Sequence, residues 1–449
     1  MTLQLNPYQA EDVAFLSTKD AACCFNQQRT GKTPTILSVL KQKGTEKNLI
    51  VCPASIIYQW KEEYEKWMNQ PCVAISGTLR QKKELISEWK SGLVISYDSL
   101  KTTKRSDGLI DLILSHKPDS IILDEAHRIK NPKSANFKSI KRLTKIPIRY
   151  ALTGTPSPNK AEEVWSILHF IDNAQWSSYW NFAKEYFKVV RVPYGNQHLE
   201  IGNFKPGKKR QLQEYLNTIA TNRKRKDVMK WLPKKDYIRI KLPLSSQQKK
   251  YLSELANYFE TETVITQGIL DRLIRYRQIC LDPGLLSLKG NSPKTDWIIQ
   301  YLKDYPEKPI IIFSKFTSYL DKLTNSLVHN NINFGTIFGS TPTLQRHQLV
   351  NEFQNGRLNL LLINIDAGKE GLTLDRAEVT IFTDKYPPIG DIEQAEDRFV
   401  STSEDKADKP HTIIELCMKD TYDEQLYDLL EQRKSETDVI NGFKKYLGG

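Results

Sequence analysis

The clearest indication of the fold of this chain is Ser120-Ile121-Ile122-Leu123-Asp124-Glu125-Ala126-His127. Its apolar first half suits a buried strand, and two carboxylates follow directly. Carboxylates at the end of a buried strand can hold a magnesium ion and polarise a water molecule, as phosphoryl transfer requires. We therefore expect Asp124 to ligate the metal and Glu125 to activate the water in an ATP-hydrolysing site. The alternative is a helix start, because acidic side chains also suit a helix N-terminus.

A candidate phosphate-binding loop lies upstream, in Gln27-Gln28-Arg29-Thr30-Gly31-Lys32-Thr33. Such a loop wraps phosphates with backbone N–H groups, while Lys32 reaches the terminal phosphates and the Thr33 hydroxyl ligates magnesium. The remaining candidate nucleotide-binding residues of the loop are Arg29, Thr30 and Gly31. The usual pattern has a glycine where this chain has Asn26, so an exposed surface loop is the alternative interpretation.

The composition fits a soluble globular protein. The chain has 449 residues, enough for two or three domains, and 39% of them are hydrophobic. Lys and Arg total 65 against 53 Asp and Glu, and this formal charge of +12 favours a polyanionic partner. The six cysteines lack the spacing of a metal site, so we expect reduced, mostly buried thiols. Neither a secretion signal nor a membrane-spanning run occurs, which predicts a soluble cytoplasmic protein.

Short apolar runs alternate with helical patterns in the first part of the chain. The runs cover residues 49–52, 93–96, 121–123 and 150–153, and helical patterns cover residues 34–40 and 55–67. This alternation is typical of a parallel sheet covered by helices, which binds ligands at the carboxyl ends of its strands. Lys32, Asp124 and Thr153 are all expected at that edge.

A second set of the same kind begins at Pro309 and carries no phosphate loop. We therefore expect one ATP to be held between two lobes, with the second lobe supplying groups from across the cleft. The expected strands of this set are residues 309–313, 334–338, 358–363, 379–383 and 412–416, with helices at residues 318–329 and 344–353.

The region between the two sets, from Ser157 to about Pro306, is far too long for a simple connection. Its aromatic first part favours helical packing over base stacking. A basic tract follows, which fits either contact with a phosphate backbone or a solvated face. The tract comprises Lys205, Lys208, Lys209, Arg210, Arg223, Lys224, Arg225, Lys226, Lys230, Lys234 and Lys235. The expected domains are a nucleotide-binding lobe at residues 1–160, a helical, DNA-facing insertion with linker at 161–290 and a second lobe at 291–449.

The order of these motifs resembles that of the Swi/Snf-type DNA translocases of helicase superfamily two, over nearly the whole chain. Residues 222–228 with 232–235, and residues 274–283, resemble two signatures that separate this family from strand-separating relatives. The resemblance implies an α/β fold with two RecA-like, doubly wound parallel-sheet lobes and a helical insertion between them. It also implies that Gln9, in Pro7-Tyr8-Gln9, hydrogen-bonds the adenine of ATP.

The same resemblance implies contacts with nucleic acid from several parts of the chain. The implied contact residues are Pro53, Ser55, Lys224, Arg225, Ser314, Gly339, Arg346 and Gly368. Gly371 belongs to a motif that touches both the DNA and the ATP cleft. In that motif Asp366 and Lys369 replace the usual arginine and glycine.

The last motif of the family resembles Gln394-Ala395-Glu396-Asp397-Arg398. By this resemblance, Gln394 and Arg398 join the catalytic set, and Arg398 reaches across the cleft to neutralise charge on the transferred phosphate. The family usually has a second arginine three residues later, where this chain has Ser401.

The expected function is ATP-dependent movement along double-stranded DNA, with ATP and Mg²⁺ as cofactors and a monomer as the working form. One alternative is a DNA or RNA helicase that separates strands. Another is a DNA-binding scaffold with weak or no ATP turnover, which Ser401 and the altered phosphate loop suggest. The lack of further recognisable modules favours a compact bacterial or bacteriophage protein, working with other DNA-processing proteins.

Overall fold

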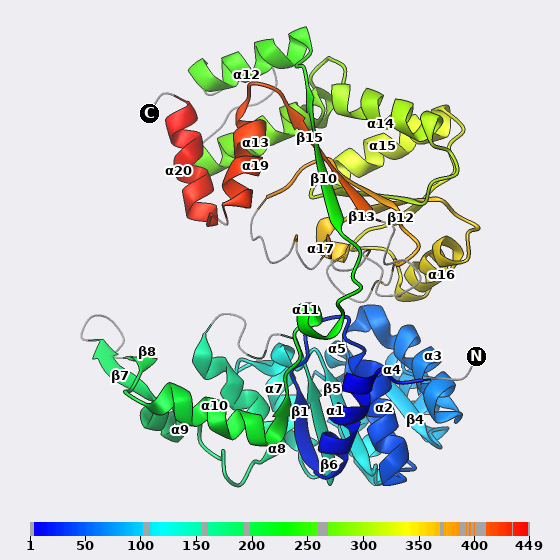
Figure 1. Ribbon diagram of the computed structural model, residues 1–449, viewed down its shortest axis with the longest axis vertical. Helices are drawn as coiled ribbons and strands as arrows, with labels where there is room; N and C mark the ends of the chain where they lie inside the picture. Colours follow the sequence, from blue (N-terminus) through cyan, green and yellow to red (C-terminus); the bar gives the residue numbers. More distant parts are fainter. Residues whose placement is uncertain are drawn as a thin grey trace. The chain divides into compact units, whose positions relative to one another are not determined.

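In the computed structural model the chain forms two compact units, Met1–Lys230 and Trp231–Gly449. The structure describes residues 4–101, 107–154, 156, 160–192, 198–258, 268–368, 372, 374–386, 392, 395–396, 399, 410–432 and 434–447. Each unit is built on its own parallel sheet, and Figure 1 shows each sheet with its helices.

The first unit contains a seven-stranded parallel sheet in the order β3-β4-β2-β5-β6-β1-β9. Its strands are β1 (Ala21–Cys24), β2 (Asn48–Cys52), β3 (Cys72–Ala74), β4 (Gly92–Ser96), β5 (Ser120–Asp124), β6 (Ile148–Leu152) and β9 (Ala220–Thr221). Strands β2 and β4 are buried along their whole length, which explains their nearly unbroken apolar sequences. The four strands expected in this part of the chain are confirmed as β2, β4, β5 and β6.

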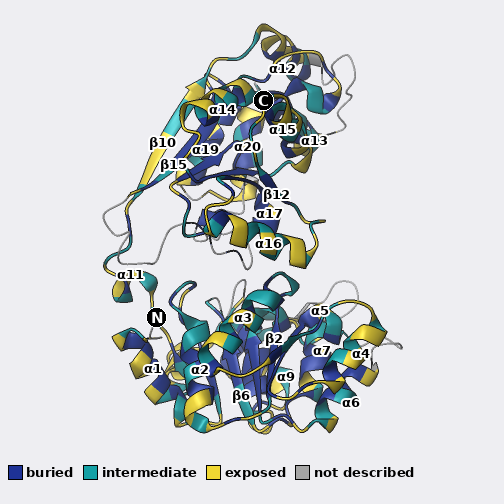
Figure 2. Ribbon diagram, turned by 90° about the vertical axis from the view of Figure 1, so that its right-hand side faces the viewer, coloured by how far each residue is buried: buried dark blue, intermediate teal, exposed yellow. Residues whose placement is uncertain are grey.

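Helices cover both faces of this sheet, and its strands are the buried layer in Figure 2. Successive residues of β2 alternate between the faces, since Ile50 packs in one apolar cluster and Val51 in the other. One face carries α1 (Pro7–Ser17), α2 (Lys32–Lys43) and α3 (Ile57–Met68). The other carries α4 (Leu79–Ser87), α5 (Tyr97–Leu100), α6 (Asp107–Ser115), α7 (Ala135–Arg142), α8 (Trp165–Ile171), α9 (Tyr179–Tyr186) and α10 (Lys208–Ile219).

The second unit contains a six-stranded parallel sheet in the order β10-β15-β14-β11-β13-β12. Its strands are β10 (Lys235–Leu242), β11 (Ile310–Ser314), β12 (Gly335–Ile337), β13 (Leu360–Asn364), β14 (Val379–Phe382) and β15 (His411–Met418). One face carries α14 (Pro293–Asp304) and α15 (Thr317–His329). The other carries α12 (Ser246–Tyr258), α13 (Ile269–Leu281), α16 (Thr343–Gln354), α19 (Tyr422–Glu431) and α20 (Glu436–Tyr446).

Two doubly wound parallel sheets, each covered on both faces, confirm the expected α/β class with two RecA-like lobes. The second set of expected strands and helices is confirmed with small shifts at their ends. The six cysteines are free and buried, as expected. None of the helices in the described part of the chain has the length and apolar character that a bilayer span requires.

The region between the two expected lobes contains strands as well as helices. Strands β7 (Phe187–Val192) and β8 (His198–Phe204) form an antiparallel hairpin, while β9 extends the first sheet and β10 the second. Aromatic residues of this region, such as Trp165, Trp176 and Phe182, pack in the core of the first unit, as predicted. The compact units divide at Lys230 and Trp231, and the three domains with limits at residues 160 and 290 remain a prediction.

Candidate nucleotide-binding site

The candidate phosphate loop connects β1 to α2. Gly31 has φ 77° and ψ 40°, a left-handed conformation, and α2 begins at the next residue, Lys32. A Cβ atom on Gly31 would overlap Nε2 of Gln9, so only glycine allows this close approach. The Lys32 ammonium donates to the carbonyl oxygens of Asn26 at 3.0 Å and Gln27 at 3.3 Å. The loop thus folds around the Lys32 side chain at the start of a helix, which is the geometry of an anion site.

Helix α1 fixes the middle of this loop through one carbonyl oxygen. Tyr8 Oη and Gln9 Nε2 both donate to the Thr30 carbonyl, at 3.0 and 3.1 Å. Gln9 Oε1 in turn accepts from the backbone N–H of Asn6 at 2.8 Å, which holds the amide in place. Burial raises the pKa of the Tyr8 hydroxyl, so it remains a neutral donor. The structure thus places Gln9 against the phosphate loop.

The two carboxylates lie at the carboxyl end of β5, where Asp124 is the last residue of the strand and Glu125 follows it. Asp124 Oδ2 accepts from the Trp60 indole N–H at 2.8 Å, and its Oδ1 accepts from the Glu125 backbone N–H at 2.9 Å. Burial, together with the neighbouring Glu125 carboxylate, raises the pKa of Asp124 to about 6. Glu125 itself adopts a left-handed backbone conformation with φ 48°, before the short 3₁₀ helix Ala126–Ile129. A second negative charge so close to a desolvated carboxylate favours a bound cation.

His127 and Thr153 connect these carboxylates to the neighbouring strands. His127 Nδ1 lies 3.3 Å from Glu125 Oε2 and 3.1 Å from the Thr153 hydroxyl. The Thr153 backbone N–H donates to the Cys24 carbonyl at 3.1 Å, at the end of β1. Because β5, β6 and β1 are adjacent in the sheet, the loops after all three strands meet at one edge. Lys32, Asp124 and Thr153 therefore lie where the sequence predicts them.

These residues fit a magnesium ion held together with a nucleotide. Magnesium usually takes one or two carboxylates plus phosphate oxygens and waters, rather than a cage of protein ligands. Asp124 is such a carboxylate, and the Thr33 hydroxyl belongs to the first turn of α2. Among the described residues there is no group of three or more His, Cys, Asp or Glu side chains that could hold a metal ion.

The expected nucleic-acid contacts of the first unit lie near this site. Pro53 precedes the short 3₁₀ helix Ala54–Ile56, and the Ser55 hydroxyl oxygen within that helix is buried. Lys224 directly precedes the short helix α11 (Arg225–Val228). The backbone N–H of Arg225 donates to the Gln27 side chain at 2.8 Å, so this basic segment lies against the phosphate loop. The DNA contacts of these residues remain predictions.

In the second unit the expected contacts differ in exposure. Ser314 is fully buried, and its hydroxyl donates to Asp384 at 2.5 Å. Gly368 ends the short helix Ile365–Gly368, where a Cβ atom would approach the Phe313 ring to 2.8 Å. Arg346 donates to the Phe338 carbonyl at 2.9 Å, whereas no atom lies within 4 Å of the Cβ position of Gly339. The contacts predicted for these residues also remain predictions.

Of the motif residues named above, the following lie outside the described residues: Lys369, Gly371, Gln394, Asp397, Arg398 and Ser401. Their expected roles remain predictions. Asp366, one of the two departures within its motif, forms an ion pair with Lys315 at 2.7 Å. Asp366 therefore has a basic partner, Lys315, directly after β11, the strand that pairs with β13.

Sequence reasoning missed residues that hold the site in place. Asp12 and Arg223 flank Asn26, the residue at the usual glycine position, and they bond to it from 14 and 197 residues away. The replacement of glycine by asparagine was the one signal for this arrangement. In the second unit, Arg277 belongs to the predicted signature at residues 274–283, but its partner, the buried Asp384 at 3.0 Å, was not predicted.

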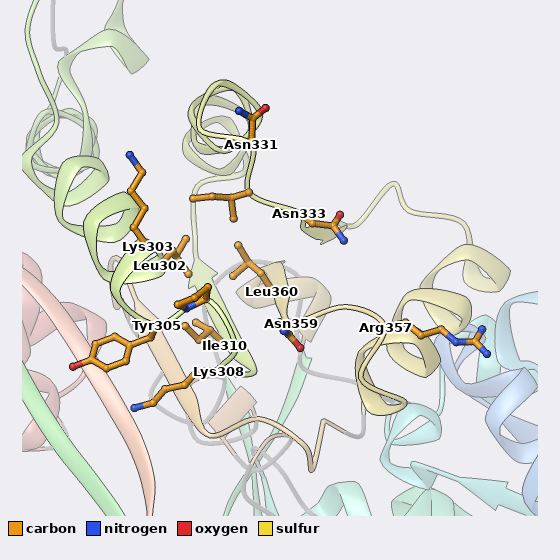
Figure 3. A pocket seen from close by; sticks show the side chains of 12 residues that line it. Leu302, Lys303, Tyr305, Lys308, Ile310, Asn331, Asn333, Arg357, Asn359 and Leu360 are labelled. Carbon is orange, nitrogen blue, oxygen red and sulfur yellow. The ribbon is translucent and has the colours of Figure 1, made fainter.

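A cavity of about 410 Å³ in the second unit lies away from all these residues. Ile310 and Leu360, at the amino ends of β11 and β13, help to line it. In Figure 3 the Arg357 side chain extends away from the other labelled side chains. Parallel sheets bind ligands at the carboxyl ends of their strands, so this cavity is not part of the candidate site.

Comparison with known families gives two consecutive matches. The SNF2-related domain matches residues 8–285, and the helicase conserved C-terminal domain matches residues 293–402. The chain is 25% identical to the DNA annealing helicase and endonuclease ZRANB3 of Bos taurus, covering 99% of this chain and 41% of that protein. It is 26% identical to the chromodomain-helicase-DNA-binding protein 1-like of Danio rerio, with 98% and 44% covered.

An uncharacterized ATP-dependent helicase of Mycoplasma pneumoniae is 25% identical, over 94% of this chain and 41% of that protein. The chain thus spans about two fifths of the length of the curated relatives it matches. Among solved structures, a Sulfolobus solfataricus SWI2/SNF2 ATPase core in complex with dsDNA is 24% identical, covers 98% of this chain and 93% of that chain, and overlaps with a TM-score of 0.44.

Proposed function

We propose, because this chain belongs to the SNF2-related family, that it hydrolyses ATP to move along double-stranded DNA. One observation carries the proposal. The phosphate loop, the Asp124–Glu125 pair and Thr153 meet at the carboxyl edge of one parallel sheet, which is where such sheets bind nucleotides. The helicase C-terminal match at residues 293–402 supports a second motor lobe.

In the proposed reaction, backbone N–H groups of Arg29, Thr30 and Gly31 bind the phosphates of ATP, and Lys32 neutralises their charge. Thr33 and Asp124 would hold Mg²⁺, which when bound offsets charge on the β- and γ-phosphates. Glu125 accepts the proton of the attacking water. His127 lies beside Glu125, with its Nδ1 at 3.3 Å from Glu125 Oε2.

The second lobe completes this proposal. Arg398, with Gln394 and Gly371, reaches the transferred phosphate and stabilises its developing charge. Gln9 selects adenine. These roles rest on the family motifs alone, since Gly371, Gln394 and Arg398 lie outside the described residues.

The proposed partner is the phosphate backbone of a DNA duplex. The formal charge of +12 supports a polyanionic partner, and the relatives in cattle and zebrafish are a DNA annealing helicase and endonuclease and a chromodomain-helicase-DNA-binding protein. The proposed contacts are Pro53, Ser55, Lys224, Arg225, Ser314, Gly339, Arg346 and Gly368. Backbone contacts of this kind give binding that is sensitive to salt and largely independent of base sequence.

The test compares ATP turnover with duplex DNA, single-stranded DNA and RNA, for the native protein and a Glu125→Gln variant. We expect duplex DNA to stimulate turnover most, and we expect the variant to lose about 10²-fold or more in kcat while it still binds ATP. Displacement of the third strand of a triplex is then measured beside unwinding of a forked duplex. Efficient fork unwinding would support a strand-separating helicase instead, and native turnover no faster than that of the variant would support a scaffold.

A further inference from the structure

The entry to the phosphate loop is held by side chains that take no part in the proposed reaction. Asn26 occupies the position where phosphate loops usually carry glycine, and it is 1% exposed. Its Nδ2 donates to Asp12 Oδ2 at 2.7 Å, and its Oδ1 accepts from the backbone N–H of Arg223 at 2.9 Å. Both ends of the Asn26 amide are therefore engaged by partners from distant parts of the chain.

Asp12 and Arg223 complete this arrangement with a partly buried ion pair. Asp12, in α1, is fully buried, and its Oδ1 accepts from Arg223 Nε at 2.9 Å. Arg223 Nη2 also donates to Glu11 at 2.9 Å, near the surface. A buried carboxylate is tolerated when it is both paired and hydrogen-bonded. Arg223 supplies the opposite charge to Asp12, and Asn26 supplies a second hydrogen bond.

The backbone around Arg223 runs beside the loop and bonds to it directly. Phe25 N–H donates to the Thr221 carbonyl at 2.8 Å, and Gln27 N–H donates to the Arg223 carbonyl at 2.9 Å. The Asn26 and Gln27 carbonyls are also the acceptors for the Lys32 ammonium. The atoms that fix Asn26 and Gln27 therefore also fix where the Lys32 side chain lies.

We propose that Arg223 is a positioning residue for nucleotide binding, which acts through Asp12 and Asn26 on the phosphate loop. This role differs from the phosphate-backbone contact that its place in the basic tract suggests. The inference rests on the proposed function, because it assumes that this loop binds ATP. Without Arg223, Asp12 keeps a buried charge without its ion-pair partner, and the loop populates its binding conformation less often. The apparent affinity for nucleotide falls in proportion to the population of the binding conformation.

The experiment measures binding of a fluorescent ATP analogue in the absence of DNA, the KM and kcat for ATP, and the Kd for duplex DNA. We expect Arg223→Gln to weaken analogue binding and to raise KM by about tenfold, with a smaller change in kcat and an unchanged Kd for DNA. Arg223→Lys should restore part of the affinity, because lysine keeps the charge but lacks the guanidinium fork. Asp12→Asn should weaken binding in the same direction.

A matched control is Arg142→Gln. Arg142 has a side-chain exposure of 36%, against 32% for Arg223, and it pairs with the exposed Asp111 at 2.7 Å in the same unit. This control should leave analogue binding unchanged. The double variant Asp12→Asn with Arg223→Gln should bind the ATP analogue at least as tightly as whichever single variant binds it less tightly. The two losses do not add, because both changes break one network. The double variant leaves no unpaired buried charge, so it carries the test if Arg223→Gln alone fails to fold.

Two results would overturn the inference. In the first, Arg223→Gln weakens DNA binding, lowers the salt slope by about one and leaves analogue binding intact, as a phosphate contact would. In the second, the double variant folds and binds the analogue like the native protein. If the native protein binds the analogue, the variants behave as expected and DNA never stimulates turnover, the translocase proposal fails while the inference on Arg223 holds.

Discussion

The Asp124 carboxylate is partly desolvated and lies beside the Glu125 carboxylate. Because its folded-state pKa is raised from 3.8 to about 6, the folded chain retains a proton in this pH range that the unfolded chain has released. The contribution of Asp124 to the free energy of unfolding is thus greatest below its unfolded-state pKa of 3.8. It is lost as pH rises through the folded-state pKa of about 6. Without a bound cation, the site is therefore under electrostatic strain near neutral pH.

We predict that Asp124→Asn raises the free energy of unfolding by about 1 to 3 kcal/mol near neutral pH, while it abolishes ATP turnover. The gain should shrink toward zero below about pH 4, where the native carboxylate is protonated in both states. Urea unfolding followed at several pH values measures this difference. Asp111→Asn, at an exposed ion pair, serves as the control and should show no such pH trend. An Asp124→Asn variant that is less stable than the native protein at neutral pH would contradict the prediction.

Gly31 offers a second test at the scale of a single residue. Its left-handed φ of 77° disfavours any other residue, and a Cβ atom there would displace Gln9 from the loop. We expect Gly31→Ala to cost about 1 kcal/mol of stability and to weaken ATP binding by about tenfold or more. Gly44 is the matched control, since it has φ 67° and nothing within 4 Å of its Cβ position.

Gly44→Ala should therefore lose similar stability and keep native ATP affinity. Equal losses of ATP affinity in Gly31→Ala and Gly44→Ala would show that backbone strain in α2, rather than the contact with Gln9, controls binding. Isothermal titration with an ATP analogue gives the affinities, and thermal unfolding gives the stabilities.

Local sequence patterns predicted the site residues that belong to short continuous motifs. Lys32 follows a Thr-Gly pair and Asp124 ends an apolar run, and these residue types in these settings indicate phosphate and metal binding. Asp12 and Arg223 could not be predicted in the same way, because their contacts with Asn26 join residues far apart in sequence. A single buried aspartate in a helix and one arginine in a basic tract carry no local signal of an ion pair.

Among the elements, the strands that escaped prediction are short or charged. Strand β1 reads Ala21-Ala22-Cys23-Cys24, with small side chains that give a weak β signal, and β9 has only two residues. Strand β10 alternates charged and apolar residues because it is an edge strand, so its Lys235 was assigned to the basic tract. Buried central strands were predicted well because helices cover both their faces.

A buried ion pair joins helix α13 to the segment that follows strand β14, which allows a test at the scale of elements. Arg277 pairs with Asp384 at 3.0 Å, and its guanidinium carbon lies 4.3 Å from the centre of the Tyr386 ring. Asp384 also accepts hydrogen bonds from Ser314 and from the Lys315 backbone. Arg277→Ala leaves this buried carboxylate without its cation and should destabilise the second unit by about 3 to 5 kcal/mol.

The control is Arg275→Ala, two residues before Arg277 on the same helix. Arg275 pairs with Asp271 at 3.3 Å, but both side chains are about one-third exposed, so its loss should cost less than about 1 kcal/mol. Urea unfolding measures both variants. Similar costs for the two variants would contradict a special role for the buried pair.

At the scale of the whole molecule, each unit has its own hydrophobic core. Within the described residues, the four apolar clusters each draw their buried side chains from one unit only. The sequence predicted this division into two sheets because the strand pattern occurs twice. Strands β9 and β10, which lie on either side of Lys230, were missed, and the domain limits at residues 160 and 290 remain a prediction.

Separate cores predict separate unfolding. We expect calorimetry of the intact chain to resolve two transitions, and Arg277→Ala should lower only the transition of the second unit. Residues 1–230 and 231–449, produced separately, should each unfold cooperatively at the temperature of the matching transition. Because the phosphate loop and Asp124 both belong to the first unit, an ATP analogue at about 100 times its Kd should stabilise that transition by about 2.7 kcal/mol. A single transition that Arg277→Ala shifts as a whole would instead mean that the two cores unfold as one cooperative body.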